Sequence, residues 1–144
     1  MRTGRRAVPL LLDTHVWLGV LEGDRRLASP DVRRAVDLAA AAGQVRISAI
    51  SVWEVAMLET KGRIRLAKDC LDWVTEALAI PGFALAPLTP EVAVGASRLP
   101  GDFHGDPADR ILVATARALG AVLVTKDRRI LDYGRDDFLA VMPA

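Results

Sequence analysis

Short apolar runs alternate with longer, capped or amphipathic segments along this chain. Residues 8–12 (VPLLL) and 121–125 (AVLVT) are continuous apolar runs, a pattern typical of strands buried on both faces, and 45–50 (VRISAI) predicts a further strand. Residues 83–88 fit a short strand or an extended connection, and 138–142 (FLAVM) predict an edge strand. Helices are predicted at residues 14–23, 30–42, 52–61, 69–80, 90–99 and 106–119.

The alternation of strands and helices favours an α/β fold with a mainly parallel central sheet and helices on both faces. A chain of 144 residues is long enough to bury its own core, so we expect residues 1–144 to form a single domain. In this architecture ligands bind outside the carboxyl ends of the strands.

Composition narrows the class of protein without identifying it. Hydrophobic residues make up 51% and charged residues 26%, which is typical of a globular chain, and the net charge is only +1. Any polyanionic partner must therefore be bound by a local patch of cations. The single cysteine, Cys70, excludes an intrachain disulfide and a cysteine-based zinc or iron–sulfur site.

The N-terminus resembles a secretory signal only faintly. Arg2, Arg5 and Arg6 precede the apolar run 8–12, but Asp13 ends that run before it reaches the roughly 7–15 residues that a signal peptide needs. No stretch approaches the roughly 18 apolar residues of a membrane span. The sequence therefore predicts a cytoplasmic protein that does not associate with a membrane.

Four acids stand at matching places in the predicted fold. Asp13 and Asp127 follow apolar strands, and Glu54 and Asp109 lie in the first turns of predicted helices. Two such carboxylates about 5 Å apart repel each other by roughly 3 kcal/mol at an effective dielectric near 20, so protons or a cation must neutralise the cluster. Oxygen ligands without a cysteine or histidine cluster favour Mg²⁺ or Mn²⁺ over zinc.

Each of these acids also has a structural explanation. Asp13 could cap the helix that follows it, and Glu54 could form a capping box with Ser51. Asp109 could be a first-turn charge behind Asp106 as the N-cap. Asp127, which two arginines follow, could be a turn residue.

Three longer motifs resemble one known family. They are LLLDTHVWL, SAISVWEVAMLETKGRI and, most specifically, DPADRILVATA with TKD after it. They resemble the PIN-domain family, in particular the VapC-type ribonuclease toxins of toxin–antitoxin pairs. The resemblance implies a PIN-like three-layer α/β/α fold and a Mg²⁺- or Mn²⁺-dependent endoribonuclease whose acidic positions correspond to Asp13, Glu54, Asp109 and Asp127.

In that interpretation Asp13 and Asp109 are the principal metal ligands, and Glu54 and Asp127 bind the metal directly or through water. Residues next to these acids could hydrogen-bond them or bind RNA phosphates, namely Thr14 and Thr125 for the former and Arg110, Arg128 and Arg129 for the latter. The resemblance further implies an RNA substrate, an inhibitory VapB-type antitoxin and a homodimer.

Two other functions compete with this hypothesis. A PIN-like module could bind RNA or protein without cutting, and a metal titration would separate the two because a binding module needs no cation. A phospho-acceptor domain or phosphatase also has an acid after its first strand. The phosphatase pattern needs a second aspartate two residues later, where this chain has His15.

Overall fold

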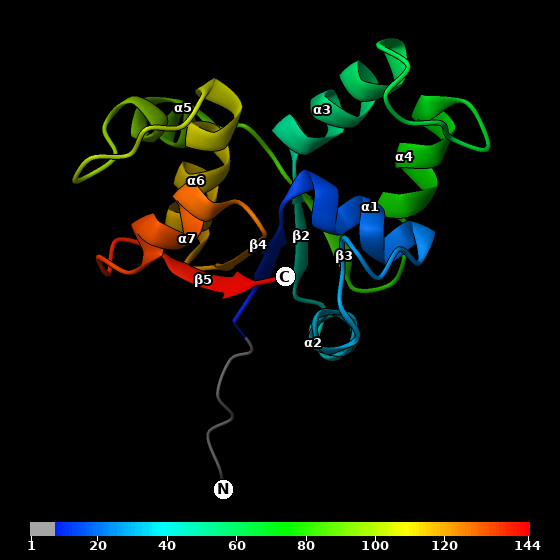
Figure 1. The fold of residues 1–144 in the computed structure, drawn as a ribbon, viewed down its shortest axis with the longest axis horizontal. Coiled ribbons are helices and arrows are strands. Elements are labelled where there is room, and N and C mark those ends of the chain that lie inside the picture. Colours follow the sequence, from blue (N-terminus) through cyan, green and yellow to red (C-terminus); the bar gives the residue numbers. More distant parts are fainter. Residues whose placement is uncertain (1–7) are drawn as a thin grey trace, which may run out of the picture.

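Parallel strands form the centre of the protein (Figure 1). The computed structural model describes residues 8–144, so the three arginines before the first apolar run lie outside the described part. Within it the sheet has five strands in the order β3-β2-β1-β4-β5, all paired in parallel. Their bounds are β1 (Leu10–Leu12), β2 (Val45–Ser48), β3 (Phe83–Ala86), β4 (Val122–Thr125) and β5 (Ala140–Pro143).

Helices cover both faces of this sheet, which confirms the predicted three-layer α/β/α architecture (Figure 1). Successive strand residues point to opposite faces, so Leu12 and Val124 belong to one core and Leu11 and Leu123 to the other. The first core packs against α1 (Thr14–Glu22), α2 (Pro30–Ala41), α3 (Ala49–Thr60) and α4 (Cys70–Leu78). On the other face lie α5 (Pro90–Ser97), α6 (Pro107–Leu119) and α7 (Arg128–Gly134).

The strand order reverses between β1 and β4. From β1 the chain crosses to β2 and β3 on one side, whereas β4 and β5 lie on the other. Such a reversal opens a crevice at the carboxyl ends of the two central strands. Asp13 follows β1, and Asp127 stands two residues beyond the end of β4.

Two predictions about local structure are wrong. The second strand ends at Ser48, and α3 begins at Ala49 because the Ser48 hydroxyl, not that of Ser51, caps it by accepting from the Ile50 amide at 3.1 Å. The short helix α7 is absent from the prediction, because its seven residues make only about two turns and bury only Ile130 and Tyr133, too few positions to show a helical period.

Aspartates cap four of the helices, and three of these caps fix where acids of the site lie. Asp13, Asp106 and Asp127 are the N-caps of α1, α6 and α7, and each carboxylate accepts backbone N–H bonds from the first turn. These bonds satisfy amides that would otherwise lack a partner. No helix among residues 8–144 has the length and apolar character needed to cross a membrane.

Candidate active site

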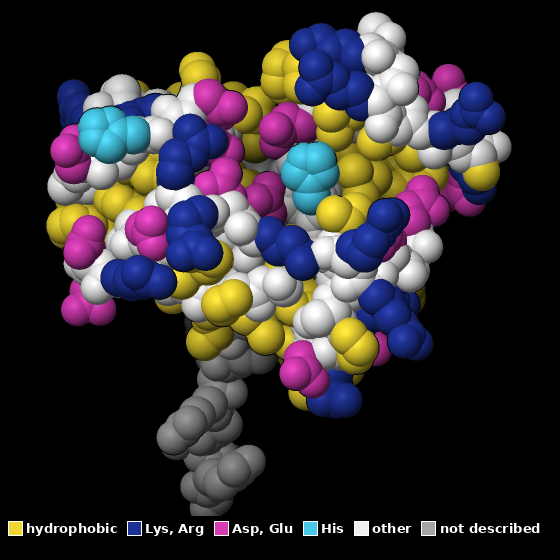
Figure 2. All heavy atoms as spheres, viewed as in Figure 1, with side chains coloured by type: hydrophobic (Ala, Val, Ile, Leu, Met, Phe, Trp, Pro, Cys, Tyr) yellow, Lys and Arg dark blue, Asp and Glu magenta, His cyan; other side chains and the backbone are white. Residues whose placement is uncertain are grey.

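Carboxylates from four parts of the chain line one cavity of about 450 Å³ beside the carboxyl ends of β1 and β4. Figure 2 shows Asp and Glu side chains gathered around a hollow near the middle of this face. The structure brings together all four predicted acids, Asp13, Glu54, Asp109 and Asp127, and adds a fifth, Asp106. His15, Lys126 and Arg129 also line the cavity.

Asp13 is the most deeply placed of these acids. Its Oδ2 accepts a 2.6 Å hydrogen bond from the Thr125 hydroxyl, and its Oδ1 accepts from the Thr14 amide at 2.6 Å. Burial raises the pKa of Asp13, and the bonds from Thr125 and Thr14 oppose that rise without cancelling it. The predicted supporting role of Thr125 thus has a definite contact, and the same residue's Oγ1 also accepts from the Asp127 amide at 3.0 Å.

Glu54 is held by Thr14 rather than by a capping box. The Thr14 hydroxyl donates to Glu54 Oε1 at 2.7 Å and lies 2.9 Å from the Ser51 hydroxyl. A hydroxyl has one proton to donate, so Thr14 donates to Glu54 and accepts from Ser51. Because α3 begins at Ala49, Glu54 lies in the second turn and the predicted first-turn position is wrong. Burial raises its pKa, and the nearby charges of Asp13 and other acids add to the rise.

Asp109 shows the strongest effect of this crowding. Its pKa is raised to about 6, mainly by burial and then by the charges of Asp106, Asp127 and Asp13. Arg129 opposes the rise, at 3.5 Å from Asp109 and 3.7 Å from Asp127. The Arg129 side chain is 58% exposed, so water weakens this compensation. The site therefore carries more negative charge than its own cations neutralise.

The three arginines proposed for RNA lie in different surroundings. Arg110 donates to the backbone carbonyls of Ala96 at 2.8 Å and Phe103 at 2.9 Å, so its guanidinium ties α6 to α5 and to the preceding loop. Because these bonds engage its guanidinium, Arg110 has a structural role and is not free to bind an RNA phosphate. Arg128 is exposed but does not line the cavity, whereas Arg129 does.

The sequence predicts Asp106 only as a helix cap. It caps α6, and its charge also raises the pKa of Glu54 and Asp109. The available signal was spacing, because residues three apart on a helix lie on the same face and Asp106 precedes Asp109 by three. Lys126, which follows β4, was missed as a cavity residue for lack of any such pattern.

The residues present fit a hydrated divalent cation. Within residues 8–144 no three acids converge on one point as a preformed metal cage. Mg²⁺ keeps several waters and is bound by one or two carboxylates, a requirement that a cavity with five carboxylates can meet. Burial, and after it the charges of neighbouring acids, raises the pKa of Asp13, Glu54 and Asp109, and a bound cation would oppose both effects.

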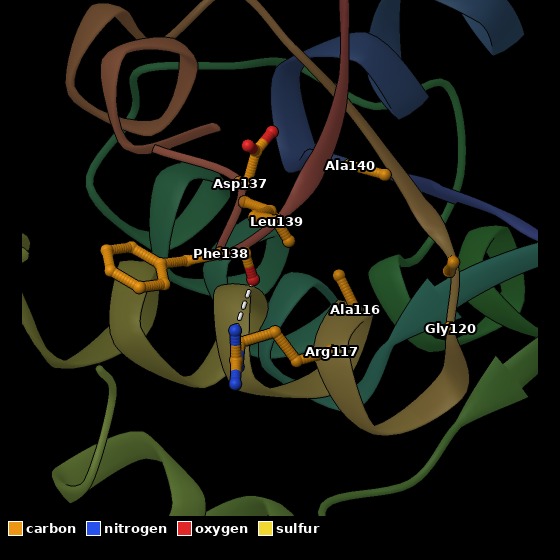
Figure 3. Close-up of a pocket in the computed structure, with 8 residues that line it drawn as sticks. Ala116, Arg117, Gly120, Asp137, Phe138, Leu139 and Ala140 are labelled. Atoms are coloured by element: carbon orange, nitrogen blue, oxygen red, sulfur yellow. Dashed lines mark hydrogen bonds between the residues drawn. The ribbon is translucent and has the colours of Figure 1, made fainter. Parts of the chain in front are cut away.

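A second cavity of about 450 Å³ lies near the start of β5 and the end of α6 (Figure 3). Arg117 and Asp137 are its charged lining residues, and the Arg117 guanidinium donates to the Phe138 carbonyl. This cavity adjoins the amino ends of β4 and β5, away from the acids, and gathers no set of groups suited to chemistry.

Comparisons with known proteins agree with this architecture. The family model described as PIN domain matches residues 10–136. The chain is 40% identical over 127 residues to Ribonuclease VapC22 of Mycobacterium tuberculosis, covering 86% of this chain and 91% of that protein.

Two solved structures share the fold at lower identity. The DNA-bound VapBC of Salmonella typhimurium matches with a TM-score of 0.66 and 17% identity, over 95% of this chain and 98% of that one. VapBC2 of Rickettsia felis, bound to a promoter DNA fragment, matches with a TM-score of 0.64 and 17% identity, over 93% and 97%. From the family match over most of its length and its identity to a curated relative, this chain belongs to the PIN-domain family.

Proposed function

We propose that this protein is a divalent-metal-dependent endoribonuclease that acts as the toxin of a toxin–antitoxin pair. The observation that carries the proposal is the cavity in which five carboxylates face two cations beside the carboxyl ends of β1 and β4. The 40% identity of this chain to a ribonuclease, over most of both chains, supports RNA as the substrate.

Mg²⁺ or Mn²⁺ is the cofactor that this set of oxygen ligands favours. We assign Asp13 and Asp109 as the principal ligands, and Glu54 and Asp127 as ligands that act directly or through water. A bound divalent cation would lower the pKa of a water molecule and stabilise negative charge on the phosphate and its leaving oxygen. In this assignment Asp106 adds negative charge and caps α6.

The surrounding residues orient these carboxylates. Thr125 and the Thr14 amide fix both oxygens of Asp13, and the Thr14 hydroxyl fixes one oxygen of Glu54. Carboxylates held in this way lose little further freedom when substrate binds, which is the benefit of a preorganised site. Asp127 is held less directly, through the backbone amides of α7 that it caps.

Arg129 is the RNA contact that we favour, since it lines the cavity and is largely exposed. Arg128 precedes it on the surface and can bind a neighbouring phosphate. Cations so placed attract the RNA backbone regardless of base sequence.

We further propose a VapB-type antitoxin as the inhibitory partner and a homodimer as the assembled form, because the family resemblance implies both. Two of the similar solved structures are named as VapBC complexes, which supports the first of these assignments. An enzyme that cleaves cellular RNA would act in the cytoplasm.

The test is cleavage of several purified RNAs by the protein with Mg²⁺ or Mn²⁺, compared with EDTA and with Asp109→Asn. We expect cleavage that needs both the metal and the carboxylate. Asp102→Asn is the matched control, since that aspartate is 91% exposed and lies outside the cavity. Cleavage that persists in EDTA and in Asp109→Asn would refute the assignment. Absence of both cleavage and metal binding would favour a binding module, because such a module needs no cation.

A further inference from the structure

An apolar groove of about 510 Å³ continues from the acid cavity between α3 and α6. Glu54 and Asp106 line both the groove and the cavity, so the two spaces are contiguous. The rest of the groove lining is apolar and consists of Ile50, Trp53, Met57, Pro107, Ala108 and Ile111. Apart from Glu54 and Asp106, no residue of this groove has a role in the proposed catalysis.

Trp53 is the prominent residue of the groove. Its side chain is 55% exposed, whereas the other two tryptophans, Trp17 and Trp73, are buried and pack against each other with ring centroids 5.1 Å apart. A large aromatic ring left in water is costly. Here the ring stands one residue before Glu54, at the edge of the proposed active site.

Exposed cations lie beyond both ends of the groove. Lys126 and Arg129 line the adjoining acid cavity, and Lys61 and Arg63 follow the C-terminal end of α3. Figure 2 shows Lys and Arg atoms over α3, close to the acids of the cavity. The groove lining itself contains no cation. An apolar floor between positive patches matches a single-stranded nucleic acid. Its phosphates bind the cations, and its bases have flat apolar faces that can stack on an aromatic ring.

We propose that this groove is a nucleobase subsite in which the Trp53 indole stacks on a base next to the scissile phosphate. The inference rests on the proposed ribonuclease function, because it takes the phosphate to lie in the acid cavity. Continuity through Glu54 and Asp106 places a neighbouring nucleotide within reach of the groove, and their carboxylates can accept hydrogen bonds from base N–H groups. Trp53 is thus a substrate-binding residue that selects how the RNA is positioned.

Cleavage kinetics of Trp53→Ala, Trp53→Phe and the wild type test the subsite. Loss of a base–aromatic stack weakens binding by about 10-fold or more. We expect KM for a single-stranded RNA to rise by about that factor in Trp53→Ala, with kcat changed far less, and Trp53→Phe to restore most of the loss. Leu38→Ala is the matched control, because Leu38 is 70% exposed on α2, far from the site. An unchanged KM in Trp53→Ala would overturn the proposal.

Intrinsic fluorescence supplies a readout that does not depend on cleavage. Trp53 is exposed, whereas Trp17 and Trp73 are buried. A single-stranded RNA oligonucleotide bound in the groove should therefore protect the Trp53 fluorescence from quenching by acrylamide. We expect no such RNA-dependent protection in Trp53→Phe. The titration is carried out with Mg²⁺ in proteins that also carry Asp109→Asn, because this substitution prevents cleavage of the RNA.

These measurements separate failure of the inference from failure of the ribonuclease assignment. A wild type that cuts RNA, with unchanged KM in Trp53→Ala, refutes the subsite alone. A protein that cuts no RNA refutes the enzymatic assignment, and protection of Trp53 by bound RNA would then support base stacking in the groove but not a scissile phosphate beside it. If Trp53 becomes protected from quenching as the protein concentration rises, without RNA, the groove binds a second copy of the chain. If an antitoxin peptide protects Trp53 and RNA does not, the groove binds that partner. Either result would overturn the proposal.

Discussion

Asp109→Asn should abolish cleavage and yet stabilise the metal-free protein. The pKa of Asp109 is raised to about 6 from its ordinary value of 3.8, so the folded protein favours the uncharged carboxyl. The stabilising contribution of this group is complete below pH about 4 and is lost as pH rises through about 6. Asparagine is uncharged at every pH and does not incur that loss.

The expected gain can be estimated from the site. A rise in pKa of this size corresponds to at most about 3 kcal/mol. The opposing attraction of Arg129 is already contained in it. The side chain is 19% exposed and the cavity is open to water, which reduces both the cost of burying the charge and the repulsion from the other acids. The charge also has a favourable place in the first turn of α6. We therefore expect Asp109→Asn to raise the free energy of unfolding by about 1–2 kcal/mol at pH 7.5.

Urea unfolding at two pH values, with and without metal, measures this effect. In EDTA the variant should be more stable than the wild type at pH 7.5, and the difference should vanish near pH 4. With Mg²⁺ at 100 times its Kd the wild type should gain about 2.7 kcal/mol, and the variant should gain less. Asp102→Asn should stay within about 0.5 kcal/mol of the wild type throughout. If Asp109→Asn is no more stable in EDTA at pH 7.5, the argument that burial and repulsion make the charged carboxylate unfavourable is refuted.

Substitutions at three further positions test other contacts. Thr125→Val should lower the free energy of unfolding by about 1–3 kcal/mol, since it removes a buried donor to Asp13, and Thr125→Ser should retain both stability and cleavage in the same assays. Arg129→Ala should weaken RNA binding and reduce its salt dependence by about one counterion in anisotropy titrations, whereas an unchanged salt slope would exclude a phosphate contact. Ser48→Ala should cost about 1 kcal/mol in thermal or urea unfolding as the loss of the α3 cap, and no loss would mean that another residue caps this helix.

Strong local patterns predicted the layers of the fold and the acids at the strand ends. The runs 8–12 and 121–125 are apolar because β1 and β4 lie between two helical layers, so the pattern reports a burial that the whole fold imposes. Asp13 and Asp127 could be placed at one edge because carboxyl ends of parallel strands meet there.

Features that depend on tertiary contacts could not be predicted in this way. Ser48 and Ser51 are equally good caps by sequence, and the choice depends on the contact that Ser51 makes with Thr14, 37 residues away. Arg110 and Arg129 each lie close to an acid of the site in the sequence, yet the Arg110 guanidinium donates hydrogen bonds to the backbone carbonyls of Ala96 and Phe103. A pattern along the chain contains neither contact.

Capping explains how a fold can hold acids that repel one another. Asp13, Asp106 and Asp127 each accept backbone N–H bonds at the start of a helix, so the structure benefits from these carboxylates even where their charges are unfavourable. Asparagine caps a helix as well as aspartate does, whereas alanine does not. At Asp127, the Asn variant should therefore lose only the charge and the Ala variant the cap as well, about 1 kcal/mol more of unfolding free energy. If Asp127→Asn and Asp127→Ala both lose cleavage but only Asp127→Ala loses stability, the charge of Asp127 serves the reaction and its capping serves the fold.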